Sequence, residues 1–231
     1  MEAKSTSSKP KRTFPPLYKS IGDEDKDKLA FIHVLERLKT QKRTGWVNHN
    51  VAGPESISDH MYRMAMLCML TSDESLDVSK CIMMALVHDL AEAQVGDIAP
   101  SEGFTKAEKH KLEEDAMRSF IHEMLHDSPA AKRIEALWRE YEEGNTPEAK
   151  FVKGVCSLFW CIIRSVLTVD TDLDRFEMAS QALEYERNQG IPTLQPFFDS
   201  SIPSLRHPEV RKWGDTLMAE RAELHGSRQT K

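Results

Sequence analysis

The chain has 231 residues, of which 40% are hydrophobic and 29% are charged, and its formal net charge is −6. This length suits one domain with tails, and the composition excludes a disordered or fibrous protein. The acidic balance leaves no broad basic surface, so we expect no nucleic-acid polymer as a partner. A small anionic substrate would need local help from a metal ion or from a few placed basic residues.

The cysteine pattern indicates a reducing compartment. The four cysteines form no Cys-x-x-Cys pair and lie in apolar stretches; they are Cys68, Cys81, Cys156 and Cys161. This pattern argues against a disulfide framework or a zinc ribbon. The first twenty residues also lack the apolar core of a secretory signal. We therefore expect a cytoplasmic protein, with the nucleus as a second location.

Two segments differ in composition from the rest of the chain. Residues 1–20 are rich in Ser, Lys, Arg and Pro, and we expect them to form a disordered tail. Gly154–Val169 is strongly apolar, but it has only about 16 residues, with Arg164 among them, where roughly 20 are needed to span a membrane. We therefore expect no transmembrane helix.

Apolar periodicity predicts a helix near the start of the chain. Within residues 24–38, apolar residues recur at spacings of three, at Leu29, Ile32, Leu35 and Leu38. This spacing is typical of an amphipathic helix. The pattern breaks at Thr44 and Gly45, and we expect residues 46–54 to form an irregular loop.

Two strongly apolar helices are predicted next. A capping-box pattern over residues 56–59 precedes an apolar run over residues 60–70, which is typical of a buried helix. A second buried helix contains residues 81–87, which are apolar on all sides. It ends abruptly in His88-Asp89, and Gly96 closes the element.

The second half of the chain continues the helical pattern. Capping or helix-start signals lie at Thr105 with Glu108, at Ser128-Pro129, at Thr146-Pro147 and at Pro208, and a further helix is expected over residues 172–189. Period-two alternation is nearly absent. The sequence therefore predicts an all-α protein with a single bundle of six to eight helices over residues 21–225, and a short tail over residues 226–231.

The most informative residues lie at the end of the second apolar helix. His88 and Asp89 follow a continuous apolar run, and helical spacing would place Glu92 on the same face as His88. Burying such groups unpaired costs several kcal/mol, so they need partners. The simplest alternative is a pair at a helix end that solvent satisfies.

A second histidine occupies an equally unusual position. His60 lies at the mouth of the other apolar helix, and two buried helices that each offer an imidazole can converge on one cation. Mixed nitrogen and oxygen ligands suit a divalent ion such as Mn²⁺, Mg²⁺ or Co²⁺. A lone histidine would more often be a hydrogen-bonded core residue, but together with His88-Asp89 it favours a metal site.

Five motifs carry a resemblance to a known family. They are Arg-Thr-Gly-Trp at 43–46, Pro-Glu-Ser-Ile-Ser-Asp-His-Met-Tyr-Arg-Met-Ala at 54–65, Leu-Val-His-Asp-Leu-Ala-Glu at 86–92, Val-Gly-Asp-Ile-Ala-Pro at 95–100 and Glu-Ala-Lys-Phe-Val-Lys at 148–153. In this order they resemble the HD-domain superfamily, and more narrowly its 5′-deoxynucleotidases. The resemblance covers about Leu29 to Arg221. It implies a metal-dependent hydrolase that converts deoxynucleoside 5′-monophosphates into deoxynucleoside and phosphate, and it implies a homodimer.

The resemblance also implies a set of metal ligands. The family's ligands match His60, His88, Asp89 and Asp174. Two imidazoles and two carboxylates leave coordination positions open for water, as metal-assisted hydrolysis requires. The expected cofactor is therefore a divalent ion, Mn²⁺, Co²⁺ or Mg²⁺.

Further residues match positions around that ion. Glu92 matches the family's functional glutamate, which orients or deprotonates the attacking water, and Asp97 with the carbonyl of Ile98 matches positions that assist the metal or the substrate. Arg43 matches an arginine that contacts the phosphate, and Trp46 resembles an aromatic residue near the sugar.

Each of these assignments has a plainer alternative. Glu92 could be a surface acid, and Asp97 could cap the following turn. Arg43 could be a solvated loop cation, and Trp46 could belong to the core. In bacterial relatives the arginine and the tryptophan are adjacent, whereas here Thr44-Gly45 separates them.

One segment departs from the family pattern. In relatives the Val-Lys pair, here ending at Lys153, runs almost directly into the helix that begins near Asp172, but 18 residues, 154–171, intervene here. As a continuous helix they would make about five turns and move Asp174 by about 27 Å along the axis. A ligand bond near 2 Å could not survive that displacement.

Three interpretations of this insertion are open. It could loop out and leave the site whole, it could form a helix that removes Asp174 and the activity, or it could be an unspliced stretch. We favour the third, because exposed Leu, Phe, Trp and Ile at this density would promote aggregation.

Two further functions compete with the main prediction. The chain could be another HD phosphohydrolase, such as a phosphodiesterase. It could also be a helical binding module whose site is impaired because the insertion displaces Asp174. Base preference and the metal used in the cell stay open at this stage.

Overall fold

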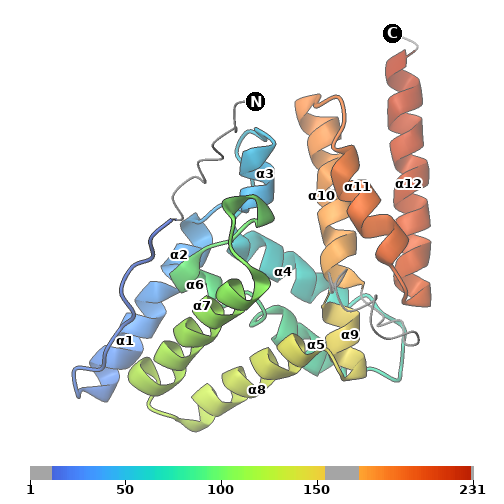
Figure 1. The fold of residues 1–231 in the computed structure, drawn as a ribbon. Helices are drawn as coiled ribbons and strands as arrows, with labels where there is room; N and C mark the ends of the chain where they lie inside the picture. Colours follow the sequence, from blue (N-terminus) through green and yellow to red (C-terminus); the bar gives the residue numbers. More distant parts are fainter. Residues whose placement is uncertain (1–11, 154–171, 230–231) are drawn as a thin grey trace, which may run out of the picture. The chain divides into compact units, whose positions relative to one another are not determined.

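The computed structural model describes residues 12–153 and 172–229, which fold into helices and connecting turns without a β-strand (Figure 1). The α-helices are α1 (Glu24–Val34), α2 (Glu36–Thr40), α3 (Thr44–Asn48), α4 (Ile57–Cys68), α5 (Val78–Ala85), α6 (Glu92–Val95), α7 (Lys106–Arg118), α8 (Pro129–Glu143), α9 (Pro147–Val152), α10 (Leu173–Gln189), α11 (Gln195–Ser201) and α12 (Pro208–Gln229). A π-helix over Ser119–Met124 follows α7. The predicted all-α class is confirmed.

The number of helices exceeds the prediction because several are very short. Seven of the described α-helices have eight or more residues, which agrees with the expected six to eight. The others have four to seven residues, too few to establish a period in the sequence. Among the described helices, none combines the length and the apolar character that crossing a membrane requires, and residues 154–169 lie outside the described part of the chain.

The described residues group into two compact units. Of the described residues, unit 1 comprises 12–50, Pro54–Ile57 and Asp89–Lys132, and unit 2 comprises Val51–Gly53, Ser58–His88, 133–153 and 172–229. The chain passes from one unit to the other several times, once at the peptide bond between His88 and Asp89.

Unit 1 is built around α1 and the π-helix. Phe31 of α1 packs against Phe120 of the π-helix, with ring centroids 5.8 Å apart. Asp27 of α1 is buried and accepts hydrogen bonds from Tyr18 Oη at 2.5 Å and Ser20 Oγ at 2.6 Å. Residues 12–20, part of the tail expected to be disordered, therefore hydrogen-bond to this unit.

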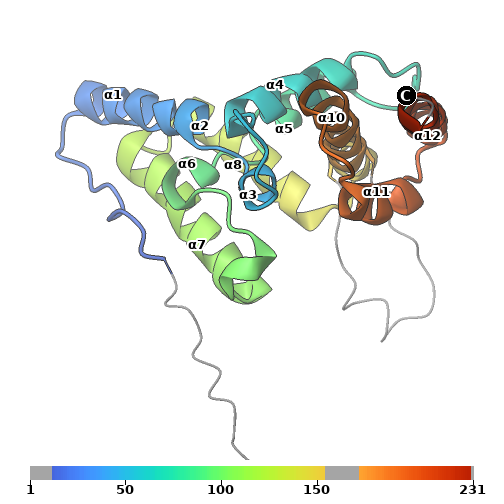
Figure 2. The ribbon, with the colours of Figure 1, turned by 90° about the horizontal axis from the view of Figure 1, so that it is seen from above.

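Unit 2 has an apolar core between α4, α5, α9 and α10. Its buried side chains include Met64, Cys68, Cys81, Met84, Phe151, Val152 and Leu173. Beyond this core, α10, α11 and α12 lie next to one another in Figure 1 and, from above, in Figure 2. The two strongly apolar runs of the sequence thus form α4 and α5, as predicted.

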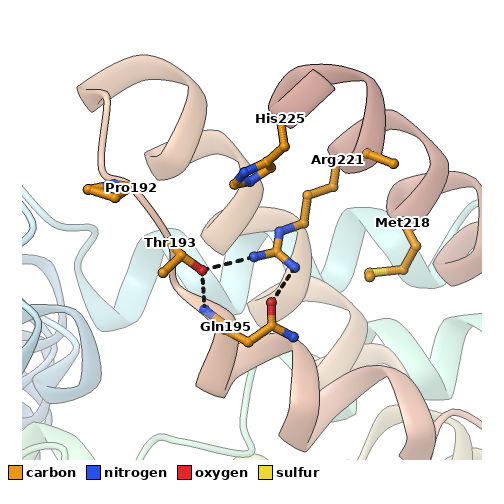
Figure 3. Close-up of a pocket in the computed structure, with 7 residues that line it drawn as sticks. Pro192, Thr193, Gln195, Met218, Arg221 and His225 are labelled. Atoms are coloured by element: carbon orange, nitrogen blue, oxygen red, sulfur yellow. Dashed lines mark hydrogen bonds between the residues drawn. The ribbon is translucent and has the colours of Figure 1, made fainter. Parts of the chain in front are cut away.

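A polar cluster joins α10 to α12. Arg221 of α12 binds the buried carboxylate of Glu186 through Nε and Nη2, both at 2.9 Å. Arg221 also contacts Thr193 and Gln195, and these three residues border a surface pocket of about 320 Å³ (Figure 3). Because α12 extends to Gln229, the predicted tail over residues 226–231 begins as helix.

Local capping signals predicted several helix ends correctly. The Thr105 side chain accepts from Glu108 N–H, and the Glu108 carboxylate accepts from Thr105 N–H, at the start of α7. Thr146 caps α9 by accepting from Ala149 N–H. Gly190 adopts a left-handed conformation after α10, with φ of 66°.

Three predicted elements differ from the structure. The helix over residues 24–38 divides into α1 and α2 at Leu35, and the loop over residues 46–54 begins with α3. The helix predicted to contain residues 81–87 and to end at His88-Asp89 already ends at Ala85, and turns and then α6 follow it. Several hydrogen bonds in these turns join residues three apart, such as Glu92 N–H to Asp89 O, which interrupts the regular α-helical spacing.

The insertion over residues 154–171 lies outside the described residues, but the chain on either side of it meets at His207. The His207 ring packs on Phe151, with centroids 4.9 Å apart, and its backbone N–H donates to the Asp172 carboxylate. The end of α9 and the start of α10 are therefore anchored at the same residue.

Candidate metal and active site

Two buried histidines come together in unit 2. His60 lies in the first turns of α4 with 0% exposure, and His88 lies just beyond α5 with 4% exposure. Their ring centroids are 5.4 Å apart, and one ring nitrogen of each lies within 4.8 Å of the other. Both rings could therefore contact one ion from adjacent helices.

The distal aspartate also reaches this pair. Asp174 is in the first turn of α10, and its Oδ1 is 3.3 Å from His60 Nε2. Asp174 thus lies beside His60 despite the 18 residues that separate Lys153 from Asp172. Phe151 and Asp172, which lie on either side of the insertion, both contact His207.

The sequence did not single out a second carboxylate on α10. Glu177 is fully buried, and its Oε2 is 2.8 Å from His60 Nδ1. It lies three residues after Asp174, one helical turn away on the same face. The spacing of three residues from Asp174 is the one sequence signal that points to Glu177, but an acid within an amphipathic helix usually faces solvent.

In unit 1, Arg43 is held between two carboxylates. Its Nη1 is 3.3 Å from Asp89 Oδ2 and its Nε is 3.8 Å from Glu55 Oε1. The Arg43 side chain is only 17% exposed, so it is not the solvated loop cation of the plainer alternative. Trp46 is buried, and its indole N–H donates to Glu55 Oε1 at 3.4 Å, which links both predicted substrate residues to Glu55.

Asp97 stabilises the helix that follows Arg43. Its Oδ2 accepts from the Thr44 N–H at 2.7 Å, and its backbone carbonyl accepts from Thr44 Oγ1 at 2.7 Å. Asp97 therefore caps α3 rather than the turn that follows it in the chain. The sequence missed α3 because a residue 53 positions away supplies its cap.

Glu92 is an acid of unit 1 whose pKa is raised by its surroundings. It is 4% exposed, and its Oε2 accepts no hydrogen bond from the described residues. Burial, followed by the negative charges of Asp89 and Asp97, raises the pKa of Glu92 well above its ordinary value. Lys109 opposes this shift, with Nζ 3.8 Å from Glu92 Oε1. Glu92 is therefore a buried group rather than a surface acid.

The stretch after α6 brings Asp97 back toward the start of α3. Gly96 ends α6 with φ of 68°, and a Cβ there would lie 2.9 Å from Gln41 Oε1. Only glycine adopts this conformation without strain. Ile98, whose carbonyl the resemblance places near the metal, is buried.

The donor set fits a divalent ion. In unit 2, the imidazoles of His60 and His88 meet edge to face, and the Asp174 carboxylate lies 3.3 Å from His60. Asp89 is the next residue in the chain after His88. Nitrogen and carboxylate donors suit a divalent ion, and no thiol is among them.

Comparison with known proteins identifies relatives over most of the chain. The HD domain family model matches residues 35–207. The chain is 41% identical over 202 residues to 5′-deoxynucleotidase hdd1 of Schizosaccharomyces pombe, covering 86% of this chain and 92% of that protein. It is 42% identical over 195 residues to 5′-deoxynucleotidase HDDC2 of Homo sapiens, covering 84% of this chain and 86% of that protein.

A solved structure supports the same relationship. The PH0347 protein of Pyrococcus horikoshii OT3 is 30% identical and superposes with a TM-score of 0.59, covering 85% of this chain and 99% of that chain. The family model extends over more than half of the sequence and includes the segments that carry His60, His88, Asp89 and Asp174. The chain therefore belongs to the HD-domain family.

Proposed function

We propose that this HD-domain protein is a 5′-deoxynucleotidase that hydrolyses deoxynucleoside 5′-monophosphates to deoxynucleoside and phosphate. The observation that carries the proposal is the buried group of His60, His88 and Asp174 in a chain whose relatives are named 5′-deoxynucleotidases. Metal-assisted hydrolysis needs such a mixed donor set with open positions.

In this proposal His60, His88 and Asp174 hold one divalent ion together with Asp89, the residue that follows His88. The ion supplies a Lewis acid for the phosphoryl oxygens and lowers the pKa of water. The buried imidazoles of His60 and His88 offer ring nitrogens, and the two aspartates neutralise the positive charge. Mn²⁺, Co²⁺ and Mg²⁺ are the candidates.

Glu92 and Arg43 act on the reactants. We assign Glu92 as the base that takes a proton from the attacking water, because its Oε2 is buried and receives no hydrogen bond from the described side chains. Lys109 favours the charged form of Glu92. Arg43, whose Nη1 lies 3.3 Å from Asp89 Oδ2, contacts the phosphate in this proposal.

The remaining assignments concern positions near these groups. We propose that Asp97 and the Ile98 carbonyl assist the ion or the substrate, and that Trp46 shapes the sugar subsite through its contact with Glu55. We also propose a homodimer in the cytoplasm. The buried free thiols of Cys68 and Cys81 agree with a reducing compartment.

The test is a panel of ribo- and deoxynucleoside monophosphates with each of the three ions. Asp89→Ala should abolish phosphate release, whereas Asp115→Ala, which removes an exposed carboxylate paired with Lys111 on α7, should leave it unchanged. Full activity of Asp89→Ala would refute the ligand assignment. Mass spectrometry of bound metal separates a hydrolase from a binding module, because the latter would hold no stoichiometric ion.

A further inference from the structure

His60 lies between two carboxylates of the same helix. Asp174 Oδ1 is 3.3 Å from Nε2 on one side of the ring, and Glu177 Oε2 is 2.8 Å from Nδ1 on the other. Both acids belong to α10, one turn apart, and His60 has no exposed surface. The ring is therefore held at both nitrogens by one rigid element.

The carboxylate of Glu177 is itself held by an arginine. Arg63 of α4 binds Glu177 Oε1 through Nε at 2.8 Å and through Nη2 at 2.7 Å, which leaves Oε2 for His60. Arg63 Nη1 in turn contacts both oxygens of Glu184, at 2.9 and 2.8 Å. Glu184, Arg63, Glu177 and His60 form a continuous chain of charge-assisted hydrogen bonds inside unit 2.

This chain has a chemical consequence for the imidazole. An ionised carboxylate can only accept hydrogen bonds, and the guanidinium of Arg63 favours the ionised form of Glu177. Glu177 Oε2, at 2.8 Å, is closer to the ring than Asp174 Oδ1, at 3.3 Å, so the proton of a neutral His60 ring belongs on Nδ1, where it faces Glu177. This leaves the lone pair on Nε2, where a divalent ion held together with Asp174 would take it.

We propose that Glu177, held by Arg63, is a positioning residue that fixes the tautomer and the orientation of His60 so that Nε2 is presented to the divalent ion. The proposal rests on the proposed function, since His60 is its metal ligand. Partners of this kind orient a ligating histidine, and losing one typically weakens metal affinity by about 10- to 100-fold. Glu177 does not touch the substrate in this proposal.

The primary test measures metal binding without any nucleotide. Mn²⁺ affinity of Glu177→Gln, followed by the electron paramagnetic resonance of free Mn²⁺, should weaken by about 10- to 100-fold relative to the wild type. Glu177→Asp, which keeps a carboxylate, should restore part of the affinity. Glu184→Gln is the matched control: it changes an acid on the same helix that contacts Arg63 but not His60, and its affinity should change by less than about threefold. Wild-type affinity in a folded Glu177→Gln protein, or equal losses in both Gln variants, would overturn the proposal.

A second measurement does not depend on a variant that folds. Nitrogen-15 spectra of the histidine rings in the metal-free wild type, recorded above the histidine titration range, should show His60 with its proton on Nδ1. A proton on Nε2 would overturn the proposal.

If the wild type binds Mn²⁺ and Glu177→Gln does not, but no nucleotide is hydrolysed, then the proposed function fails while this positioning role stands.

Discussion

The capping of α3 by Asp97 predicts a specific pattern in two substitutions. Asp97→Ala removes the acceptor of the Thr44 N–H, whereas Asp97→Asn keeps a side-chain oxygen that can accept it. α3 has only five residues and no cap from its own side chains, so it cannot compensate. The bond from Thr44 Oγ1 to the Asp97 backbone survives both changes.

The size of the effect follows from the geometry. Loss of an N-cap typically costs about 1 kcal/mol, within a range of about 0.5 to 2. We expect Asp97→Ala to lose about that much free energy of unfolding and Asp97→Asn to lose much less. Arg43 immediately precedes α3 and contacts Asp89 at 3.3 Å, so the same loss should also disturb its position. If about 1 kcal/mol appears in substrate binding, KM rises roughly fivefold.

The assays are urea unfolding and steady-state phosphate release from a deoxynucleoside monophosphate. Asp97→Ala should lose stability and raise KM. Asp97→Asn should keep the wild-type stability and the wild-type KM, so that any effect of the missing charge appears in kcat alone. Asp115→Ala is the control for removing an acid from unit 1. A loss of stability in Asp97→Asn as large as in Asp97→Ala would refute the capping argument.

Four further outcomes are expected. The raised pKa of Glu92 means that the folded state holds this proton more tightly than the unfolded state does. The unfolding free energy of the metal-free protein, measured with urea, should therefore fall as the pH rises from the ordinary glutamate range through the raised pKa. Glu92→Gln should flatten this pH dependence, and the same dependence in the wild type and the variant would contradict the argument. Burial raises the pKa of Cys68 and Cys81 to about 12, so mass-mapped iodoacetamide labelling at neutral pH should reach both only after unfolding, and native labelling would be the contrary result. Gly96→Ala should cost about 1 kcal/mol or more in urea unfolding, and an unchanged midpoint would argue against strain there. Deleting residues 154–171 should preserve Mn²⁺ binding measured by mass spectrometry, and loss of the ion would show that the segment is needed.

Features determined by neighbours in the chain were predictable from the sequence. The capping box at Thr105 and the helix start at Thr146 act over three residues, and the structure confirms both. The apolar runs around His60 and His88 correctly predicted two helices, but their predicted burial on all sides is wrong, because each keeps an exposed face, as Met66 at 43% and Met83 at 46% show. The pairing of the two histidines then follows from the packing of those helices.

Features determined by distant residues were not predictable in this way. α3 depends on a carboxylate that lies 53 residues away, so its own sequence looked irregular. Glu177 looked like an ordinary helix acid until Arg63 and His60 were placed against it. The position of Asp174 could not be predicted from the sequence, because the sequence does not show the path of residues 154–171. The start of α10, which carries Asp174, is held by the contact between Asp172 and His207, a residue 35 positions further along the chain.

The contacts of Phe151 and Asp172 with His207 have a practical use. Because the ends of α9 and α10 are fastened to a common residue, the length of the connection between them can vary without displacing Asp174. Each doubling of a flexible connection costs only about 0.6 kcal/mol in closure entropy. The connection between α9 and α10 is therefore a suitable place to insert a fluorescent reporter or an affinity tag. The insert would be close in sequence to the first turn of α10 but would not displace it.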